Sequence, residues 1–196
     1  MPVFRQAEFV LAAHDFAQLP PETGVEVAFA GRSNAGKSSA INAIVHRRRL
    51  AFVSNTPGRT QAINFFSLGA QRFLVDLPGY GYAAVSKAER RNWGTLISTY
   101  IRSRRSLRGL IVVMDARHPF TPLDLQLLNW ITPLGKASHV LLTKADKLGK
   151  REAATALTKA ESIASQCANC SVQLFSATTG RGVEAAQRVI AEWLRE

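Results

Sequence analysis

The sequence predicts a three-layer α/β domain with a mostly parallel sheet and helices on both of its faces. Apolar, strand-like runs alternate with amphipathic helical segments along almost the whole chain of 196 residues, which is typical of strands joined by crossover helices. Residues 109–115 are nearly all apolar, as a parallel strand covered on both sides requires. A glycine-rich loop at residues 31–38, between the first strand and the first helix, fits the same class.

Local patterns indicate where each element lies. Gly69-Ala70 indicates a hairpin, which makes one strand of the sheet antiparallel. We expect six strands, over residues 25–30, 63–68, 72–76, 109–115, 140–143 and 172–175. We expect helices over residues 37–49, 86–105, 121–132, 151–165 and 183–194. Residues 1–23 are expected to form an N-terminal segment packed on the domain, which spans residues 24–196.

The glycine-rich loop fits the pattern G-x-x-x-x-G-K-[ST] through Gly31, Gly36, Lys37 and Ser38. The glycines let the backbone turn tightly and present N–H groups to phosphate oxygens. The lysine brings a cation to the β and γ phosphates, the serine hydroxyl binds Mg²⁺, and the following helix directs its positive end at the same anion. The candidate phosphate-binding residues are Gly31, Arg32, Ser33, Asn34, Ala35, Gly36, Lys37, Ser38 and Ser39.

Three further polar loops follow expected strands, at residues 76–79, 143–146 and 176–178. The carboxyl ends of parallel strands meet at one edge of the sheet, where ligands bind. Together with Thr60, the order and content of these loops resemble the five G motifs of translation-factor-type GTPases. In that arrangement the carboxylate of Asp146 accepts from N1–H and the exocyclic amino group of guanine, donors that adenine does not offer there. The pattern therefore favours GTP over ATP.

Four segments are similar to those of the EngB (YihA/YsxC) family of bacterial GTPases. They are residues 31–38, 56–61, 76–83 and 143–146, and the resemblance covers nearly the whole chain from about Ala7. It implies a Ras-like P-loop GTPase domain that binds and hydrolyses GTP as a switch. It also implies a role in assembly of the large ribosomal subunit, with normal cell division and septation depending on it. The expected partners are the precursor of that subunit and its ribosomal RNA.

The resemblance also implies roles for individual residues. The expected catalytic residues are Lys37, Thr60 and Gly79, and the expected Mg²⁺ ligands are Ser38, Thr60 and Asp76. Thr56 is an alternative to Thr60. The stem of Lys144 is expected along the guanine base, and the Ala177 N–H at guanine O6. The other expected nucleotide-binding residues are Gly58, Arg59, Gln61, Ala62, Leu77, Pro78, Thr143, Ala145, Asp146, Phe175 and Ser176. The switch segments are expected at residues 54–61 and 77–86.

One position departs from Ras-type chemistry. Those proteins place a glutamine directly after D-x-x-G to orient the attacking water, whereas this chain has Tyr80 there. Backbone groups of the loop at residues 56–60, or the ribosome, would then position the water. Relatives with an asparagine at the place of Asn34 use a potassium ion beside the phosphates, and we expect the same of this chain. We also expect hydrolysis to be slow without the ribosomal partner.

The charge of the chain indicates an anionic partner. The 25 basic and 14 acidic residues give a net charge of +11, which favours nucleic acid, although a generally basic proteome is a plainer explanation. The basic tract at residues 46–49 suits either a solvated helix end or contact with RNA. No apolar run reaches eighteen residues and no signal peptide is evident, so we expect a cytoplasmic monomer with no membrane or DNA partner.

Two other functions fit parts of the pattern. The chain could be a guanine-nucleotide-gated RNA-binding module whose hydrolysis is incidental, and Tyr80 in the glutamine position keeps that alternative open. A nucleotide or small-molecule kinase would also use the phosphate loop, but it would need lid and acceptor residues that are not evident here, and it would not require guanine.

Overall fold

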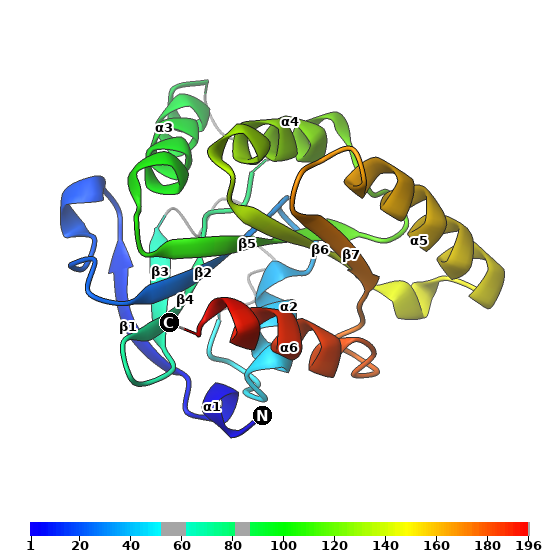
Figure 1. Ribbon diagram of the computed structural model, residues 1–196, viewed down its shortest axis with the longest axis horizontal. Coiled ribbons are helices and arrows are strands. Elements are labelled where there is room, and N and C mark those ends of the chain that lie inside the picture. Colours follow the sequence, from blue (N-terminus) through cyan, green and yellow to red (C-terminus); the bar gives the residue numbers. More distant parts are fainter. Residues whose placement is uncertain (52–61, 81–86, 196) are drawn as a thin grey trace.

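A computed structural model describes residues 1–51, 62–80 and 87–195, with only the helical backbone described over 87–94. Its centre is a seven-stranded sheet in the order β1-β3-β4-β2-β5-β6-β7 (Figure 1). The strands are β1 (Glu8–Ala13), β2 (Val25–Gly31), β3 (Ile63–Ser67), β4 (Arg72–Asp76), β5 (Leu107–Asp115), β6 (Ala137–Thr143) and β7 (Cys170–Leu174). The α/β class and the mostly parallel sheet are confirmed.

The expected number of six strands was wrong, because β1 adds a seventh. It pairs antiparallel with β3 at the edge of the sheet, with an irregularity between Phe9 and Leu11. Most of its side chains are exposed, so the strand carries no alternating apolar pattern that would reveal it in the sequence. The single antiparallel strand is confirmed as β3, which runs opposite to β4 and to β1.

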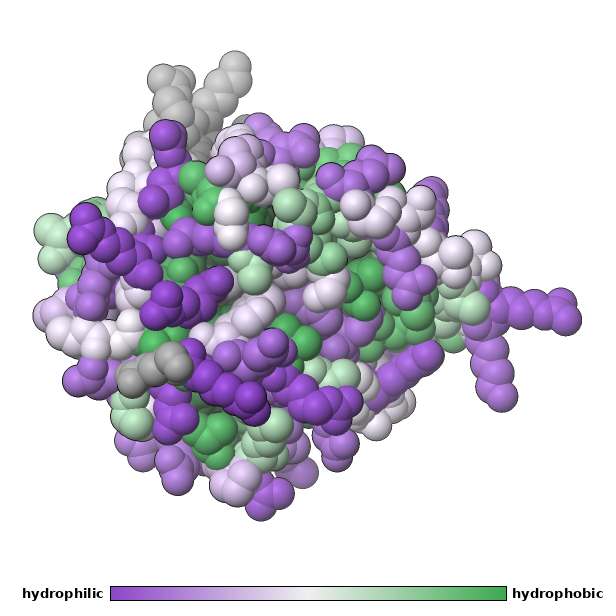
Figure 2. Space-filling view, in the orientation of Figure 1, coloured by the Kyte–Doolittle hydropathy of each residue, from purple (hydrophilic) through white to green (hydrophobic). Residues whose placement is uncertain are grey.

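Helices cover both faces of the sheet. One core cluster joins the sheet to α3 (Lys87–Ser103), α4 (Pro122–Ile131) and α5 (Lys150–Ala164). The other joins it to α1 (Pro2–Arg5), α2 (Lys37–Ile44) and α6 (Val183–Trp193). In Figure 1, α1 and α6 lie toward the viewer, and Figure 2 shows that this face is largely hydrophilic. The expected start of the third helix at Ser86 lies outside the described residues.

The first helix after the glycine-rich loop is shorter than expected. α2 ends at Ile44, and His46 has a positive φ of 54°, which stops the helix. The arginines at positions 47–49 therefore lie on a loop and not on the last turn of the helix. This corrects the expected helix over residues 37–49.

A buried ion pair fastens the end of the sheet opposite to the expected ligand edge. Arg104 contacts both carboxylate oxygens of Glu26, with Nη2–Oε1 at 2.8 Å, and the two residues are 4% and 2% exposed. The hydroxyl groups of Tyr100 and Ser106 also donate to Glu26, at 2.6 and 2.8 Å. Nη2 of Arg104 donates in addition to the carbonyl of Pro20. These contacts hold the start of β2 against the end of α3.

Candidate functional site

The glycine-rich loop follows β2 at the carboxyl edge of the sheet. Gly36 has a φ of +95°, and its α-carbon faces the Thr143 side chain, whose Oγ1 lies 3.5 Å from where a β-carbon would stand. A β-carbon on Gly31 would approach the Val113 carbonyl oxygen to 2.7 Å. The loop can therefore follow this path only with glycine at both positions. α2 begins directly after it, at Lys37.

Lys37 and Asp76 form a buried ion pair at this edge. Nζ of Lys37 contacts Oδ1 of Asp76, and the two residues are 9% and 3% exposed. Asp76 is the last residue of β4, and Ser38 follows Lys37 in the first turn of α2. The structure thus brings together Lys37, Ser38 and Asp76, whereas Thr60, the other expected metal ligand, lies outside the described residues. A hydroxyl and a carboxylate are the hard oxygen donors that Mg²⁺ accepts alongside phosphate oxygens, so this donor set fits that ion.

The segment after Asp76 runs along the glycine-rich loop. The Tyr80 N–H donates to the Gly31 carbonyl at 3.2 Å, and the Ser33 N–H donates to the Tyr80 carbonyl at 3.0 Å. Gly79 lies so close that a β-carbon would stand 3.1 Å from Oγ of Ser33. The side chain of Tyr80 points to α4, where its hydroxyl donates to Oδ1 of Asp124 at 2.9 Å. It therefore does not stand in for the water-orienting glutamine.

The loop after β6 is tied to the glycine-rich loop. The Thr143 hydroxyl lies within hydrogen-bond distance of the carbonyls of Ala35 and Met114. Nζ of Lys144 donates to the Asn34 carbonyl at 2.8 Å, and Lys144 and Asn34 both have a positive φ, of 57° and 65°. The loop expected to bind phosphate and the loop expected to bind the base are therefore fixed relative to each other.

Asp146 is exposed and held by a neighbouring loop. Ser176, which is fully buried, donates its hydroxyl hydrogen to Oδ1 of Asp146 at 2.6 Å. The Ala145 N–H donates to the Phe175 carbonyl, which joins the two loops by backbone as well. The hydrogen bond from Ser176 holds the pKa of Asp146 below its ordinary value, so the carboxylate stays ionised. An ionised carboxylate at this place can accept two N–H donors at once.

Asp115 is a residue of the site that the sequence reasoning missed. It ends β5, and its Oδ2 lies 2.9 Å from Nζ of Lys144 and 2.6 Å from Nη2 of Arg117. Partial burial opposes ionisation, but the bonds from Arg117 and Lys144 outweigh it and hold the pKa of Asp115 well below its usual range. The signal available in the sequence was its position, since it is an acidic residue ending a buried strand at the ligand edge.

Most of the predicted site residues lie at this one edge. The described ones are residues 31–39, 62, 76–79, 143–146 and 175–177. Among them Ala62, Leu77 and Pro78 are buried, and Asn34 and Ala177 are exposed. Thr56, Gly58, Arg59, Thr60 and Gln61 lie outside the described residues, and so does most of both expected switch segments.

Comparisons with known proteins agree with this arrangement. A family model described as "50S ribosome-binding GTPase" matches residues 26–144. A probable GTP-binding protein EngB from Methylobacillus flagellatus is 55% identical over 195 residues, which cover 99% of this chain and 94% of the relative. One from Nitrosomonas eutropha is 54% identical over 100% of this chain and 88% of its own. This chain belongs to the EngB family of GTP-binding proteins.

Solved structures extend the likeness to the fold. The crystal structure of a probable EngB protein matches with a TM-score of 0.68 and 21% identity over 87% of this chain and 99% of the other. Era, in a complex with MgGDPNP and a segment of 16S ribosomal RNA, matches with a TM-score of 0.69 and 21% identity over 88% of this chain and 57% of Era. As a member of the EngB family, the chain is a guanine-nucleotide-binding protein. In the part that the structure describes, no helix is long and apolar enough to cross a membrane.

Proposed function

We propose that this protein hydrolyses GTP as a switch in assembly of the large ribosomal subunit, and that normal cell division and septation depend on it through that assembly. The observation that supports the proposal is that one sheet edge carries a buried cation at one end and a carboxylate at the other, as binding of phosphate and of guanine would require. Lys37 stands at one end beside Asp76, and Asp146 stands at the other, fixed by Ser176. Lys144 and Thr143 connect the two ends.

Each residue has a chemical task in this proposal. Lys37 would neutralise the β and γ phosphates, and Ser38, Thr60 and Asp76 would hold a Mg²⁺ ion that supplies further positive charge to them. The Gly79 N–H reads the γ-phosphate. Asp146 selects guanine, and the Ala177 N–H binds its O6. Loss of the γ-phosphate then changes the order of the segments at residues 54–61 and 77–86, and the protein releases the particle.

The tyrosine after D-x-x-G makes the intrinsic reaction slow. Because the Tyr80 hydroxyl is hydrogen-bonded to Asp124, it does not orient the attacking water. That task falls to backbone groups or to the ribosomal partner. A potassium ion beside Asn34 supplies positive charge to the phosphates. The exposed position of Asn34 on the glycine-rich loop supports this assignment.

The proposed partner is the precursor of the large subunit and its ribosomal RNA. Two facts support it, namely the ribosome-binding GTPase family that matches the chain and the net charge of +11. We propose that the protein acts as a monomer in the cytoplasm, with no membrane or DNA partner.

The test is GTP hydrolysis with purified large-subunit precursor particles, in K⁺ and in Na⁺. We expect stimulation by the particles in K⁺ that fades in Na⁺. Asp146→Asn should lose the response to GTP and gain one to xanthosine triphosphate, because the oxygen at C2 of xanthine suits an amide donor. Equal hydrolysis in both salts, with and without particles, would overturn both the potassium role and activation by the partner.

The second candidate is a nucleotide-gated RNA-binding module with incidental hydrolysis. The hydrogen bond from Tyr80 to Asp124 favours it, since it holds the side chain at the glutamine position against α4. Lys37→Ala and Asp76→Ala separate the two functions. If the protein is a GTPase switch, both variants should stop releasing the particle while their affinity for bare RNA is unchanged. Release that persists in both variants would favour the binding module.

A further inference from the structure

The chain after α2 forms a loop with a fixed base, residues 46–50, which we name the arginine loop. The side chain of Asn42, which is 7% exposed, binds both the N–H and the carbonyl of Ala51. Its Nδ2 donates to the Ala51 carbonyl at 2.8 Å, and its Oδ1 accepts from the Ala51 N–H at 2.8 Å. This pair of bonds closes the loop across its base, as a pair of backbone bonds closes a hairpin.

The start of the arginine loop is fixed from the neighbouring helix. Gln187 of α6 is 2% exposed, and its Nε2 donates to the Ile44 carbonyl at 2.6 Å. The same nitrogen lies 3.0 Å from Nε2 of His46. The loop is therefore held at both ends by buried amide side chains, so its arginines start from a fixed backbone.

Three consecutive arginines, Arg47, Arg48 and Arg49, are exposed on this loop. Within the described residues, no carboxylate lies within ion-pairing distance of any of them. Among the described residues, the Arg47 guanidinium donates only to the carbonyl of Arg5, at 3.4 Å. The dipole of α2 acts within its last turn, and Arg48 and Arg49 lie beyond its cap at Val45, so the dipole does not account for them. Adjacent like charges repel, which makes an anionic partner the natural complement.

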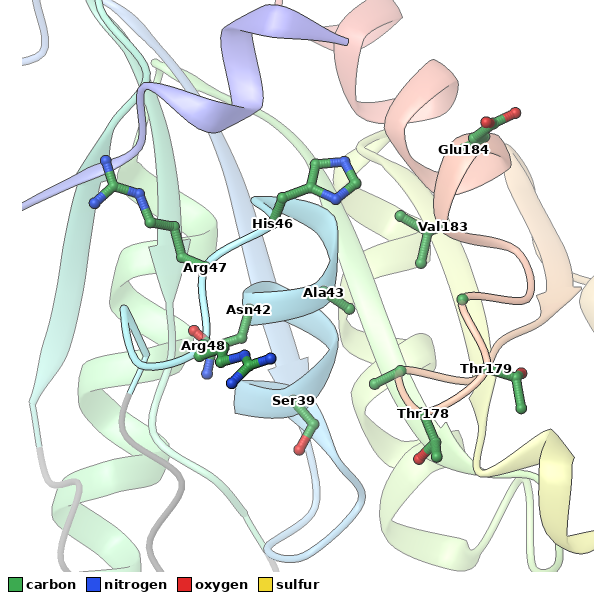
Figure 3. Close-up of a pocket in the computed structure, with 12 residues that line it drawn as sticks. Ser39, Asn42, Ala43, His46, Arg47, Arg48, Thr178, Thr179, Val183 and Glu184 are labelled. Carbon is green, nitrogen blue, oxygen red and sulfur yellow. The ribbon is translucent and has the colours of Figure 1, made fainter.

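A pocket of about 670 Å³ lies between the arginine loop and the loop that follows Ser176. Arg47 and Arg48 line one side of it, and Thr178, Thr179 and Glu184 line the other. Ser39 and Ala177, which are expected to bind the nucleotide, also line it, so the pocket adjoins the expected nucleotide site. Figure 3 shows that Arg47 and Arg48 leave the loop in different directions, with Arg47 turned toward the N-terminal segment. Arginine and threonine side chains both donate hydrogen bonds to phosphate oxygens, and the single carboxylate, on Glu184, keeps phosphate on the arginine side.

We propose that the arginine loop binds the phosphate backbone of ribosomal RNA. This inference rests on the proposed function and specifies which surface of the protein contacts the RNA. Each guanidinium group can bind a phosphate through two parallel hydrogen bonds, and because Arg47 and Arg48 point in different directions they would contact separate phosphates. The one apolar side chain of the loop, Leu50, packs against the core and is not offered to a partner, so the chemistry favours RNA over an acidic protein.

The test compares two triple variants that remove the same charge from different faces. Arg47→Gln/Arg48→Gln/Arg49→Gln changes the arginine loop, and Lys150→Gln/Arg151→Gln/Lys159→Gln changes exposed residues of α5, which packs on the opposite face of the sheet. Binding to a large-subunit ribosomal RNA transcript and to precursor particles is measured over a salt series. GTP affinity and urea unfolding check that each variant is folded.

We expect the arginine-loop variant to lose at least about tenfold in RNA affinity near 0.1 M salt, with GTP affinity unchanged. The slope of log K against log salt should fall in magnitude by about 2 to 3. Each phosphate contact releases about 0.7 to 0.9 of a counterion when it forms, and the variant forms three fewer contacts. The α5 variant should lose much less. Glu184→Gln should tighten binding, because it removes the one carboxylate that lines the pocket.

Each of the following outcomes would overturn the inference. Equal losses of RNA affinity in both triple variants would mean that net charge, and not a defined surface, drives binding. Normal RNA affinity in the arginine-loop variant would mean that the loop does not bind RNA. Loss of binding to an acidic polypeptide such as polyglutamate, with RNA affinity retained, would indicate a protein partner. If particles stimulate hydrolysis by the arginine-loop variant and the wild type equally, the proposed function stands and only this surface fails. A wild-type protein that binds neither RNA nor particles would overturn both.

Discussion

The hydroxyl of Tyr80 donates to the carboxylate of Asp124 at 2.9 Å, and this bond connects the segment after β4 to the first turn of α4. Asp124 is 1% exposed and also accepts from the Thr121 N–H and hydroxyl, at 2.9 and 2.7 Å. Burial, and then the negative charge of Asp124, raise the pKa of the Tyr80 phenol far above its ordinary value, so it remains a donor at every working pH. The residue in the expected catalytic position thus has a structural contact.

Tyr80→Phe tests that assignment. We expect the free energy of unfolding to fall by about 1.5 to 3 kcal/mol, the range for a hydrogen bond to a charged group, because a buried carboxylate loses one donor. Intrinsic GTP hydrolysis should change less than about threefold, since the phenol does not face the phosphates. Thr121→Val is the control that takes a different donor from Asp124. A hundredfold loss of hydrolysis with stability intact would show that Tyr80 acts on the reaction.

The stability of the protein should depend on the Lys37–Asp76 ion pair, so that removing either charge lowers the free energy of unfolding. Asp76→Asn should lower the free energy of unfolding, measured in urea with EDTA and without nucleotide, by about 3 kcal/mol, because it leaves a buried ammonium group unpaired. The double variant Lys37→Met/Asp76→Asn should recover part of that loss. Mg²⁺ should cease to improve GTP affinity in Asp76→Asn. An unchanged response to Mg²⁺ would remove Asp76 from the metal site.

Guanine binding should persist in acid. The Ser176 bond lowers the pKa of Asp146, so the ionised form and the binding it supports are fully present above the ordinary value of 3.8 and are lost as pH falls through the lower pKa of the folded protein. Ser176→Ala should raise that pKa toward 3.8, and the pH at which GDP binding is half lost should rise with it. Carboxyl-carbon NMR of Asp146 measures the pKa directly. An identical pH midpoint in both proteins would contradict the role of the Ser176 hydroxyl.

The Glu26–Arg104 pair should matter for stability and not for nucleotide. Glu26→Gln should lower the free energy of unfolding by about 3 to 5 kcal/mol, because Arg104 keeps its charge in a buried site. Glu26→Leu/Arg104→Met should restore much of it, since no buried charge is left. GDP affinity should be the same in both variants at a temperature where each is folded. A change in GDP affinity would reveal coupling between the two ends of β2.

The sequence predicted those parts of the fold and site that depend on local spacing. It predicted the glycine-rich loop, the residues after β4 and β6, and the single antiparallel strand, because turn residues and apolar runs determine these features locally. β1 was not, since an exposed edge strand such as Glu8–Ala13 need not alternate. The Tyr80–Asp124 and Lys144–Asp115 contacts join residues far apart in the chain, and no local pattern encodes which strand ends become neighbours.

The bonds from Lys144 and Thr143 back to the glycine-rich loop have a consequence for synthesis of the chain. They span 110 and 108 residues, and the Ser176 bond to Asp146 requires a further stretch of chain. Such contacts form only after the later strands have docked, and chains emerge from the ribosome N-terminus first. A nascent chain therefore carries its glycine-rich loop long before the loops that hold Asp146 and Ser176 can join it. The growing protein should remain empty of nucleotide until β7 and the loop after it have been made.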